Sequence, residues 1–137
     1  MCGISGILSP NIDAGNAQSV IESSLHSIKH RGPDHSGLLI DKSYALGHVR
    51  LSIIDLSDDG NQPMRDSSGR FTIVYNGETY NYKDLISDVS LDSNSLSSSS
   101  DTAVVLEAFG KLGVDLFPKL NGMFAFCIID NDLNKAW

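Results

Sequence analysis

The chain has 137 residues with a formal net charge of −7, 41% hydrophobic and 20% charged residues, which is typical of one compact domain with its own core. Its ten Lys and Arg residues are scattered along an acidic chain, so the clustered cations that bind nucleic acid or an anionic membrane are missing. No apolar stretch approaches the ~20 residues that span a bilayer, no signal peptide is recognisable, and two cysteines are too few for a disulfide framework, which together favour a cytoplasmic protein.

The first predicted elements are a strand, a helix and a turn. Gly3–Leu8 is short and apolar, which predicts a buried strand. Apolar residues recur on one helical face within residues 17–30, so a helix is expected there with Asn16 as its N-cap. Residues 31–34, Arg-Gly-Pro-Asp, end this helix with residues typical of turns.

The middle of the chain is predicted to alternate strands with polar loops. Residues 38–40, 44–54 and 71–75 are predicted strands, and residues 55–63 form a polar loop. Residues 87–100 contain eight serines, a composition typical of a flexible surface connection.

A helix and a last strand follow the serine-rich segment. Ser100 or Asp101 is expected to cap the helix, which ends at Gly113. The apolar stripe of this helix consists of Val104, Val105, Ala108, Phe109 and Leu112. Residues 123–130 form a continuous apolar run, which predicts a fully buried strand. Residues 131–137 indicate a turn whose following strand is missing, so the chain is expected to be cut short.

Metal and nucleotide motifs are missing from the sequence. The four histidines show no recognised metal-ligand spacing, and the two cysteines form no CxxC pair. There is neither a GxGxxG segment nor a P-loop. No cofactor or metal is therefore expected in this chain.

Cys2 is the sharpest candidate for chemistry. It follows Met1 directly, and its small side chain favours removal of Met1. An N-terminal cysteine combines a nucleophilic thiol with an α-amino group that accepts its proton. The ordinary α-amino pKa is about 7.7–8.0, so roughly a tenth to a fifth of this group is neutral at pH 7. Position alone also fits an incidental cysteine at a frayed terminus.

A series of short motifs runs along nearly the whole chain. They are MCGISGI (residues 1–7), HRGPDHSG (30–37), GHVRLSIID (47–55), QPM (62–64), YNGETYN (75–81), SDT (100–102) and LNGMFAF (120–126). This ordered set resembles the class II, or N-terminal nucleophile, glutamine amidotransferases. The RLSI segment is similar to the asparagine synthetase branch and differs from the sugar-phosphate and phosphoribosyl amidotransferases.

The resemblance implies hydrolysis of the side-chain amide of L-glutamine. The Cys2 thiolate attacks the amide, ammonia leaves, and water releases glutamate from a thioester. An oxyanion forms twice and needs two donors, which the resemblance assigns to the Asn76 side-chain amide and the Gly77 backbone N–H. Taken alone, Asn-Gly indicates a type I′ hairpin turn; both interpretations hold if a turn at a strand end presents the donors.

The same resemblance implies a binding pocket for glutamine. Its residues are Arg50, Leu51, Ser52, Ile53, Ile54, Asn76, Gly77, Glu78 and Asp101. Arg50 matches the residue that binds the α-carboxylate, which suits a bidentate guanidinium, and Asp101 matches the residue that receives the α-ammonium. Without the resemblance, Arg50 fits a surface arginine at a strand end and Asp101 fits a helix N-cap.

The resemblance implies an α+β fold, the four-layer αββα sandwich of N-terminal nucleophile hydrolases. It also implies that residues 1–137 are one type-2 glutamine amidotransferase domain, which is incomplete at its C-terminus. The synthetase domain, with its ATP and Mg²⁺, is absent, so the expected partners are L-glutamine and a separate synthetase domain or subunit. That partner would use the ammonia in asparagine biosynthesis.

Other interpretations stay open from the sequence. The chain could be a non-catalytic remnant of such a synthetase, or a module that binds glutamine without turnover, although the latter needs neither Cys2 nor oxyanion donors. Thr79 replaces the usual aliphatic residue, and flexibility in the serine-rich segment could weaken the pocket. His30, Arg31 and Asp34 belong to a motif that shapes a loop in the family, and no catalytic role is expected for them. Cys127 is expected to be a small, inert hydrophobic residue.

Overall fold

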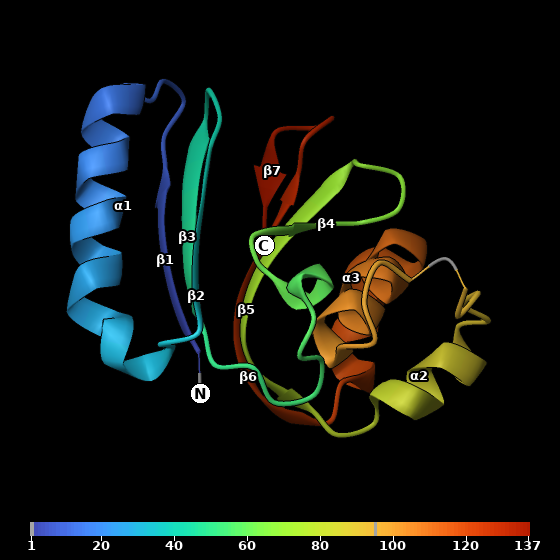
Figure 1. Cartoon of the computed structure of the whole chain (residues 1–137). Coiled ribbons are helices and arrows are strands. Elements are labelled where there is room, and N and C mark those ends of the chain that lie inside the picture. The colour runs from blue at the N-terminus through green and yellow to red at the C-terminus, as the bar shows by residue number, and fades with distance from the viewer. Residues whose placement is uncertain (1, 95) are drawn as a thin grey trace.

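The computed structural model of the chain describes residues 2–94 and 96–137 (Figure 1). The elements follow in this order, with η for 3₁₀ helices: β1 (Gly3–Leu8), α1 (Ala14–Ile28), η1 (Lys29–Arg31), β2 (His35–Ile40), β3 (Tyr44–Arg50), η2 (Asp58–Gly60), β4 (Met64–Arg65), β5 (Phe71–Thr79), α2 (Tyr82–Asp88), α3 (Asp101–Leu112), η3 (Gly113–Lys119), β6 (Gly122–Asp130) and β7 (Lys135–Ala136). Strands of the described residues form two antiparallel sheets, sheet A in the order β1-β3-β2 and sheet B in the order β4-β5-β6-β7. The predicted α+β class is confirmed.

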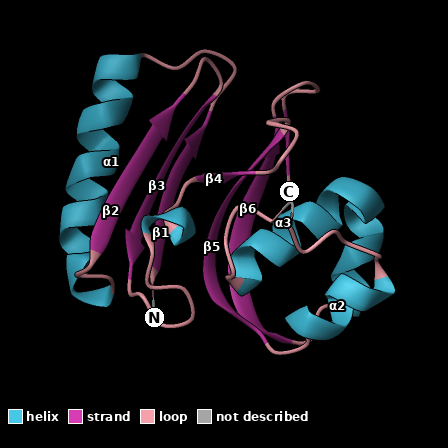
Figure 2. Cartoon of the chain, turned by 45° about the vertical axis from the view of Figure 1, so that its right-hand side comes forward, coloured by secondary structure: helices cyan, strands magenta, loops and turns pink. Residues whose placement is uncertain are grey.

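The helices lie on the outer faces of the two sheets (Figure 1). Helix α1 packs on sheet A, α3 and α2 lie beyond sheet B, and the inner faces of the sheets oppose each other (Figure 2). Strand β3 is buried along its whole length, and its side chains alternate between the two sides. Ala45 and Val49 join the core beneath α1, whereas Tyr44 and Leu46 join the core between the sheets. This alternation directs His48 and Arg50 toward sheet B.

Helix starts and stops follow the predicted chemistry with one exception. Helix α1 begins at Ala14 because Asp13 is its N-cap, with Oδ1 accepting from the Asn16 N–H at 3.0 Å. The predicted Asn16 cap was wrong, because the apolar stripe marks the buried face and not the polar first turn. Ser100 caps α3 as predicted, since its Oγ accepts from the Ala103 N–H at 3.3 Å. Gly113, at φ 56°, ends that helix.

Four strand predictions need correction. The strand predicted over residues 44–54 ends at Arg50. Residues 123–130 are not fully buried, because Met123 is 67% exposed and only the C-terminal end of β6 lies in the core. The missing partner of this strand was also a wrong prediction, since β7 pairs with Ile129 and Asp130. Asn76 and Gly77 lie within β5, paired with β6, and form no hairpin turn.

Helix α2 was not predicted, because Leu85 is its only fully buried residue and seven residues give no clear period. None of the helices in the described residues is long and apolar enough to cross a bilayer.

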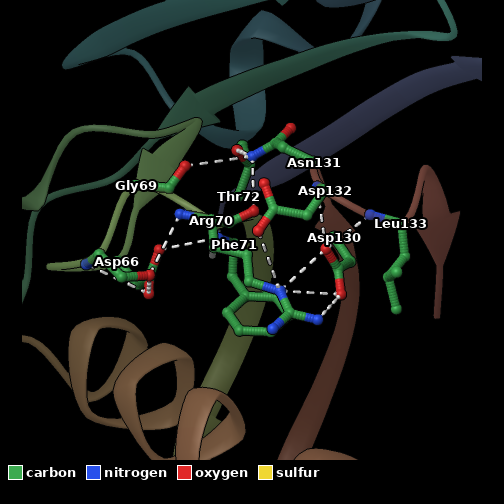
Figure 3. A network of polar contacts seen from close by, with 10 residues as sticks. Asp66, Gly69, Arg70, Phe71, Thr72, Asp130, Asn131, Asp132 and Leu133 are labelled. Carbon is green, nitrogen blue, oxygen red and sulfur yellow. Dashed lines mark hydrogen bonds and ion pairs between the residues drawn. The ribbon is translucent and has the colours of Figure 1, made fainter.

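A polar network fixes the ends of β5 and β6 (Figure 3). Arg70 binds the buried Asp130 carboxylate through Nη2 at 2.6 Å and Nε at 3.0 Å. These bonds hold the pKa of Asp130 below its usual range. Asp130 Oδ1 also accepts from the N–H groups of Asp132 and Leu133. One carboxylate thus joins β5, β6 and the turn into β7.

His48 links the two sheets from a fully buried position. Its Nε2 lies 3.1 Å from the Tyr75 carbonyl oxygen. A carbonyl only accepts, so Nε2 carries the proton, while Nδ1 has no partner among the described residues. Burial lowers the pKa of His48 to about 4, and the nearby His35 and Arg50 act in the same direction. The folded protein therefore holds this imidazole neutral.

The first prediction concerns acid stability. The unfolded chain binds a proton at His48 near pH 6.5, whereas the folded chain binds it only near pH 4. The stability that the neutral His48 contributes is therefore present above pH 6.5 and lost as the pH falls toward 4. The contribution of His48 to the free energy of unfolding should fall by about 2 kcal/mol between pH 7 and pH 5. Urea unfolding at both pH values should show this loss in the wild type and in the exposed control His26→Gln, and a smaller loss in His48→Gln. Equal losses in all three proteins would contradict the account.

Candidate active site

A cavity of about 110 Å³ lies where the C-terminal end of β3, the strand β5 and the start of α3 meet. Among the predicted site residues, those that line it are Cys2, Arg50, Leu51, Ile53, Ile54, Gly77, Glu78 and Asp101. Gly60, Gln62 and Tyr75 complete its wall together with other residues. Side chains from five separate stretches of sequence therefore converge on one space.

Two predicted residues do not line this cavity. The Ser52 N–H donates to Asp34 Oδ2 at 2.8 Å, which shapes the loop after β3. Asn76 lies in β5 next to Gly77, and its Oδ1 is buried with no partner among the described residues.

Cys2 lies at the start of β1, beside the end of β3. Its Sγ is 3.4 Å from the Leu51 nitrogen and 3.7 Å from the Leu51 oxygen. Arg31 Nε donates to the Cys2 carbonyl oxygen at 3.0 Å. Arg31 therefore holds the backbone of the candidate nucleophile, a contact that the sequence did not indicate. Met1, whose removal the sequence predicts, lies outside the described residues.

Arg50 is a buried cation that no carboxylate neutralises in the described part of the chain. Its Nη1 donates to the Ser57 carbonyl at 2.7 Å and to Asn61 Oδ1 at 2.8 Å, and Nη2 donates to the Asp55 carbonyl. All three acceptors are uncharged. A guanidinium has five N–H donors, so two have no acceptor among the described residues. The interpretation as a surface arginine is wrong, since Arg50 is only 6% exposed.

Asp101 occupies the first turn of α3. Its Oδ2 accepts from the Thr79 N–H at 2.8 Å, and Oδ1 accepts from the Thr102 N–H at 2.9 Å. Burial raises the pKa of Asp101, and the neighbouring Glu78 adds to the rise. The cap itself is Ser100, so Asp101 is free of that role and lies at the cavity wall.

Asp55 orders this site through hydrogen bonds that the sequence did not indicate. Its Oδ1 accepts from the N–H and Oγ of Ser57, at 2.8 and 2.7 Å. Its Oδ2 accepts from Ser98 Oγ at 2.7 Å and from the N–H and Oγ of Ser99, at 3.1 and 3.2 Å. Hydrogen bonds from Ser57, then Ser98, hold the pKa of Asp55 well below its usual range.

The end of the serine-rich segment is therefore not a flexible connection. Ser98 and Ser100 are buried, and Ser98 Oγ accepts from the Ser100 N–H at 3.0 Å. The composition indicated flexibility, but the buried Asp55 carboxylate accepts from the hydroxyl groups of Ser98 and Ser99. Ser95 lies outside the described residues.

Two more polar groups order the wall of the cavity. Gln62 Oε1 accepts from the Tyr75 N–H at 2.6 Å, at a position of β5 that pairs with β6 and lies beyond the short pairing with β4. The Tyr75 hydroxyl lies 2.8 Å from Thr79 Oγ1. Thr79 is fully buried, so its hydroxyl has a specific partner where an aliphatic side chain was expected.

Gly77 is required because the backbone of β6 passes close to it. A Cβ at this position would lie 2.5 Å from Phe124 Cα and would overlap the Met123 carbonyl.

No group of three or more His, Cys, Asp or Glu side chains within residues 2–94 and 96–137 is arranged to hold a metal ion.

Comparison with known proteins finds one matching family model and several similar proteins. Residues 1–136 match the family model described as a glutamine amidotransferase domain. A putative asparagine synthetase [glutamine-hydrolyzing] 2 of Methanocaldococcus jannaschii is 40% identical over 95% of this chain and 28% of its own length. Asparagine synthetase B [glutamine-hydrolyzing] of Escherichia coli is 32% identical over 96% of this chain and 24% of its own. The amidase chry2 of Gibberella zeae is 38% identical over 96% of this chain and 21% of its own.

The chain thus spans about a quarter of the length of these curated relatives. The similarity to the two synthetases covers nearly all of this chain, as expected for an asparagine synthetase-like glutaminase domain.

The second prediction tests how tightly Arg50 is held. A Cβ at Gly60 would lie 2.8 Å from Arg50 Cζ and would overlap Nη2. The guanidinium is fixed by three hydrogen bonds and cannot move without losing some of them. Gly60→Ala should therefore lower the free energy of unfolding by about 1–3 kcal/mol, measured by urea denaturation.

The control is Gly15→Ala in α1, where a Cβ meets nothing closer than 3.6 Å. It should cause no loss of stability, since alanine favours a helix. A Gly60→Ala protein as stable as the wild type would show that Arg50 is loosely held.

Proposed function

This chain belongs to the glutamine amidotransferase domain family, and from that membership we propose that it hydrolyses L-glutamine to L-glutamate and ammonia. The observation that carries the proposal is the convergence of Cys2, Arg50, Gly77 and Asp101 on one cavity. These residues come from distant parts of the sequence, and each has the chemistry that one part of glutamine requires.

In the proposed reaction Met1 is removed and Cys2 becomes the N-terminus. The α-amino group accepts the thiol proton, and the thiolate attacks the side-chain carbonyl carbon of glutamine. The resulting oxyanion accepts from the Gly77 N–H and the Asn76 amide. Collapse breaks the C–N bond, and the leaving nitrogen takes the proton from the ammonium of Cys2 and departs as ammonia.

The second half of the reaction releases glutamate. Water attacks the thioester carbon and gives a proton to the α-amino group, and the same two donors bind the second oxyanion. Collapse breaks the C–S bond and restores the Cys2 thiol. Asn76 lies next to Gly77 in β5, so the two proposed donors are adjacent in the chain.

Glutamine would be held by its charged end. Two N–H donors of Arg50 remain for the α-carboxylate, and a buried guanidinium with neutral acceptors is stabilised by an anion. Asp101 and Glu78 would receive the α-ammonium, with the loop of residues 51–54 along the side. The carboxylate oxygens of Asp101 already accept from Thr79 and Thr102, which fixes their direction.

We further propose that residues 1–137 form a type-2 domain of the αββα sandwich kind found in N-terminal nucleophile hydrolases. Packing of α1 on sheet A and α3 on sheet B supports this (Figure 1). In this proposal the ammonia passes to a synthetase domain or subunit in the cytoplasm, and ATP and Mg²⁺ belong to that partner alone. The relatives are named as synthetases and amidases, so their similarity supports the shared glutaminase half-reaction and not one acceptor.

The third prediction tests the nucleophile. Cys2→Ala should abolish glutamate release in a coupled glutamate dehydrogenase assay, because no thioester can form, while glutamine binding stays measurable by calorimetry. The matched control is Cys127→Ala, which changes the other free cysteine and should keep wild-type turnover. Unchanged turnover in Cys2→Ala would refute the mechanism. Binding without turnover in the wild type would favour the glutamine-binding module, and the loss of both would favour the remnant.

The fourth prediction concerns the substrate carboxylate. Arg50→Ala should raise KM for glutamine about 10- to 100-fold, as expected for a charged hydrogen bond worth about 1.5–3 kcal/mol. The exposed Arg65→Ala serves as the control and should leave KM unchanged. A wild-type KM in the Arg50→Ala protein would remove Arg50 from the pocket.

A further inference from the structure

Asp55 is a buried carboxylate that no cation pairs with in the described residues. Asp55 is 9% exposed, and the five hydrogen bonds to its carboxylate oxygens come from Ser57, Ser98 and Ser99. Two of these donors are backbone N–H groups, which cannot rotate away. A buried anion is stable only when such donors surround it. The arrangement therefore requires a side chain at position 55 in which both terminal atoms accept hydrogen bonds.

One side of this carboxylate controls the surroundings of Arg50. Oδ1 binds Ser57 twice and closes the turn over residues 55–57. The carbonyl oxygens at the two ends of that turn, those of Asp55 and Ser57, are acceptors for the Arg50 guanidinium. The Asp55 side chain therefore fixes the geometry in which Arg50 is held.

The other side controls the start of α3. Oδ2 binds Ser98 and Ser99, and Ser98 Oγ in turn accepts from the Ser100 N–H. Ser100 is the N-cap of α3, and Asp101 is the first residue of that helix. The bond between Ser98 and Asp55 joins residues 43 positions apart in the sequence and so links the loop after β3 to the segment that precedes α3.

We propose that Asp55 is a positioning residue of the glutaminase site, whose carboxylate fixes Arg50 and Asp101 at the separation that the α-carboxylate and α-ammonium of one glutamine require. This inference rests on the proposed function. Both groups of the substrate are attached to the same carbon atom, so their two receptors cannot shift independently without loss of one contact. Asp55 itself does not touch the reacting amide in this scheme.

Asp55→Asn is the sharpest test, because it keeps the shape of the side chain. In either orientation of the amide, its nitrogen would face a backbone N–H, that of Ser57 or that of Ser99, and two donors cannot bond. The control is Asp59→Asn in the same loop, which makes the same charge change at an exposed residue. Both variants and the wild type are assayed for kcat and KM with L-glutamine and with glutaramate, which is glutamine without its α-amino group.

The proposal predicts a specific pattern. In Asp55→Asn, KM for L-glutamine should rise about tenfold or more, with kcat changed less than threefold. The ratio of kcat/KM for L-glutamine over glutaramate should fall at least fivefold, because glutaramate does not use Asp101. Asp59→Asn should match the wild type in all three quantities. A KM within twofold of the wild type, or an unchanged ratio of the two substrates, would overturn the proposal, since partial unfolding lowers activity toward both substrates equally.

A second pair of variants covers the case in which Asp55→Asn does not fold. Ser98→Ala removes one hydrogen bond to Asp55, and Ser98→Thr keeps the hydroxyl group. The substrate ratio should fall in the alanine variant and be restored in the threonine variant. Equal ratios in both would contradict the proposal.

The failure of this inference is distinguishable from failure of the proposed function. If the wild type releases no glutamate from glutamine, the function itself fails. If the wild type is active and the Asp55 and Ser98 variants keep its substrate ratio, only the positioning role fails.

Discussion

The buried guanidinium of Arg50 is the interaction on which the rest of the site depends. Arg50 is the C-terminal residue of β3 and is only 6% exposed. Its guanidinium is held by two backbone carbonyls and a side-chain amide oxygen. Neutral acceptors satisfy its hydrogen bonds without cancelling its charge, so an anion entering the cavity is stabilised there. The carboxylate end of an amino acid is such an anion.

The two-sheet architecture places the other groups around this cation. The alternation along β3 directs Arg50 toward sheet B, where β5 contributes Gly77 and Glu78 to the cavity. The close approach of β6 to Gly77 leaves no room for a side chain there. Because α3 packs on sheet B, its first residue, Asp101, reaches the same cavity from the other side. Packing of the core thereby sets the geometry of a polar site.

Short-range chemistry made much of this predictable from the sequence. The Ser100 cap, the Gly113 stop and the course of β1 depend on neighbouring residues, and ordered motifs indicated most of the residues that line the cavity. What the sequence could not give are contacts between distant segments. The bond from Asp55 to Ser98 joins two polar loops, and each loop alone indicated a solvated connection. Arg31 likewise has no local sign of its bond to Cys2, and the buried hydroxyl of Thr79 has its partner on Tyr75.

The most direct test of the central claim is the intact mass of the protein before and after incubation with 6-diazo-5-oxo-L-norleucine, a glutamine analogue that alkylates an active nucleophile. The account predicts loss of Met1 and a single adduct, which peptide mapping places on Cys2 and which an excess of L-glutamine prevents. A protein that loses Met1 but takes up no adduct, or takes it up on Cys127, would contradict a glutamine-shaped site built around Cys2.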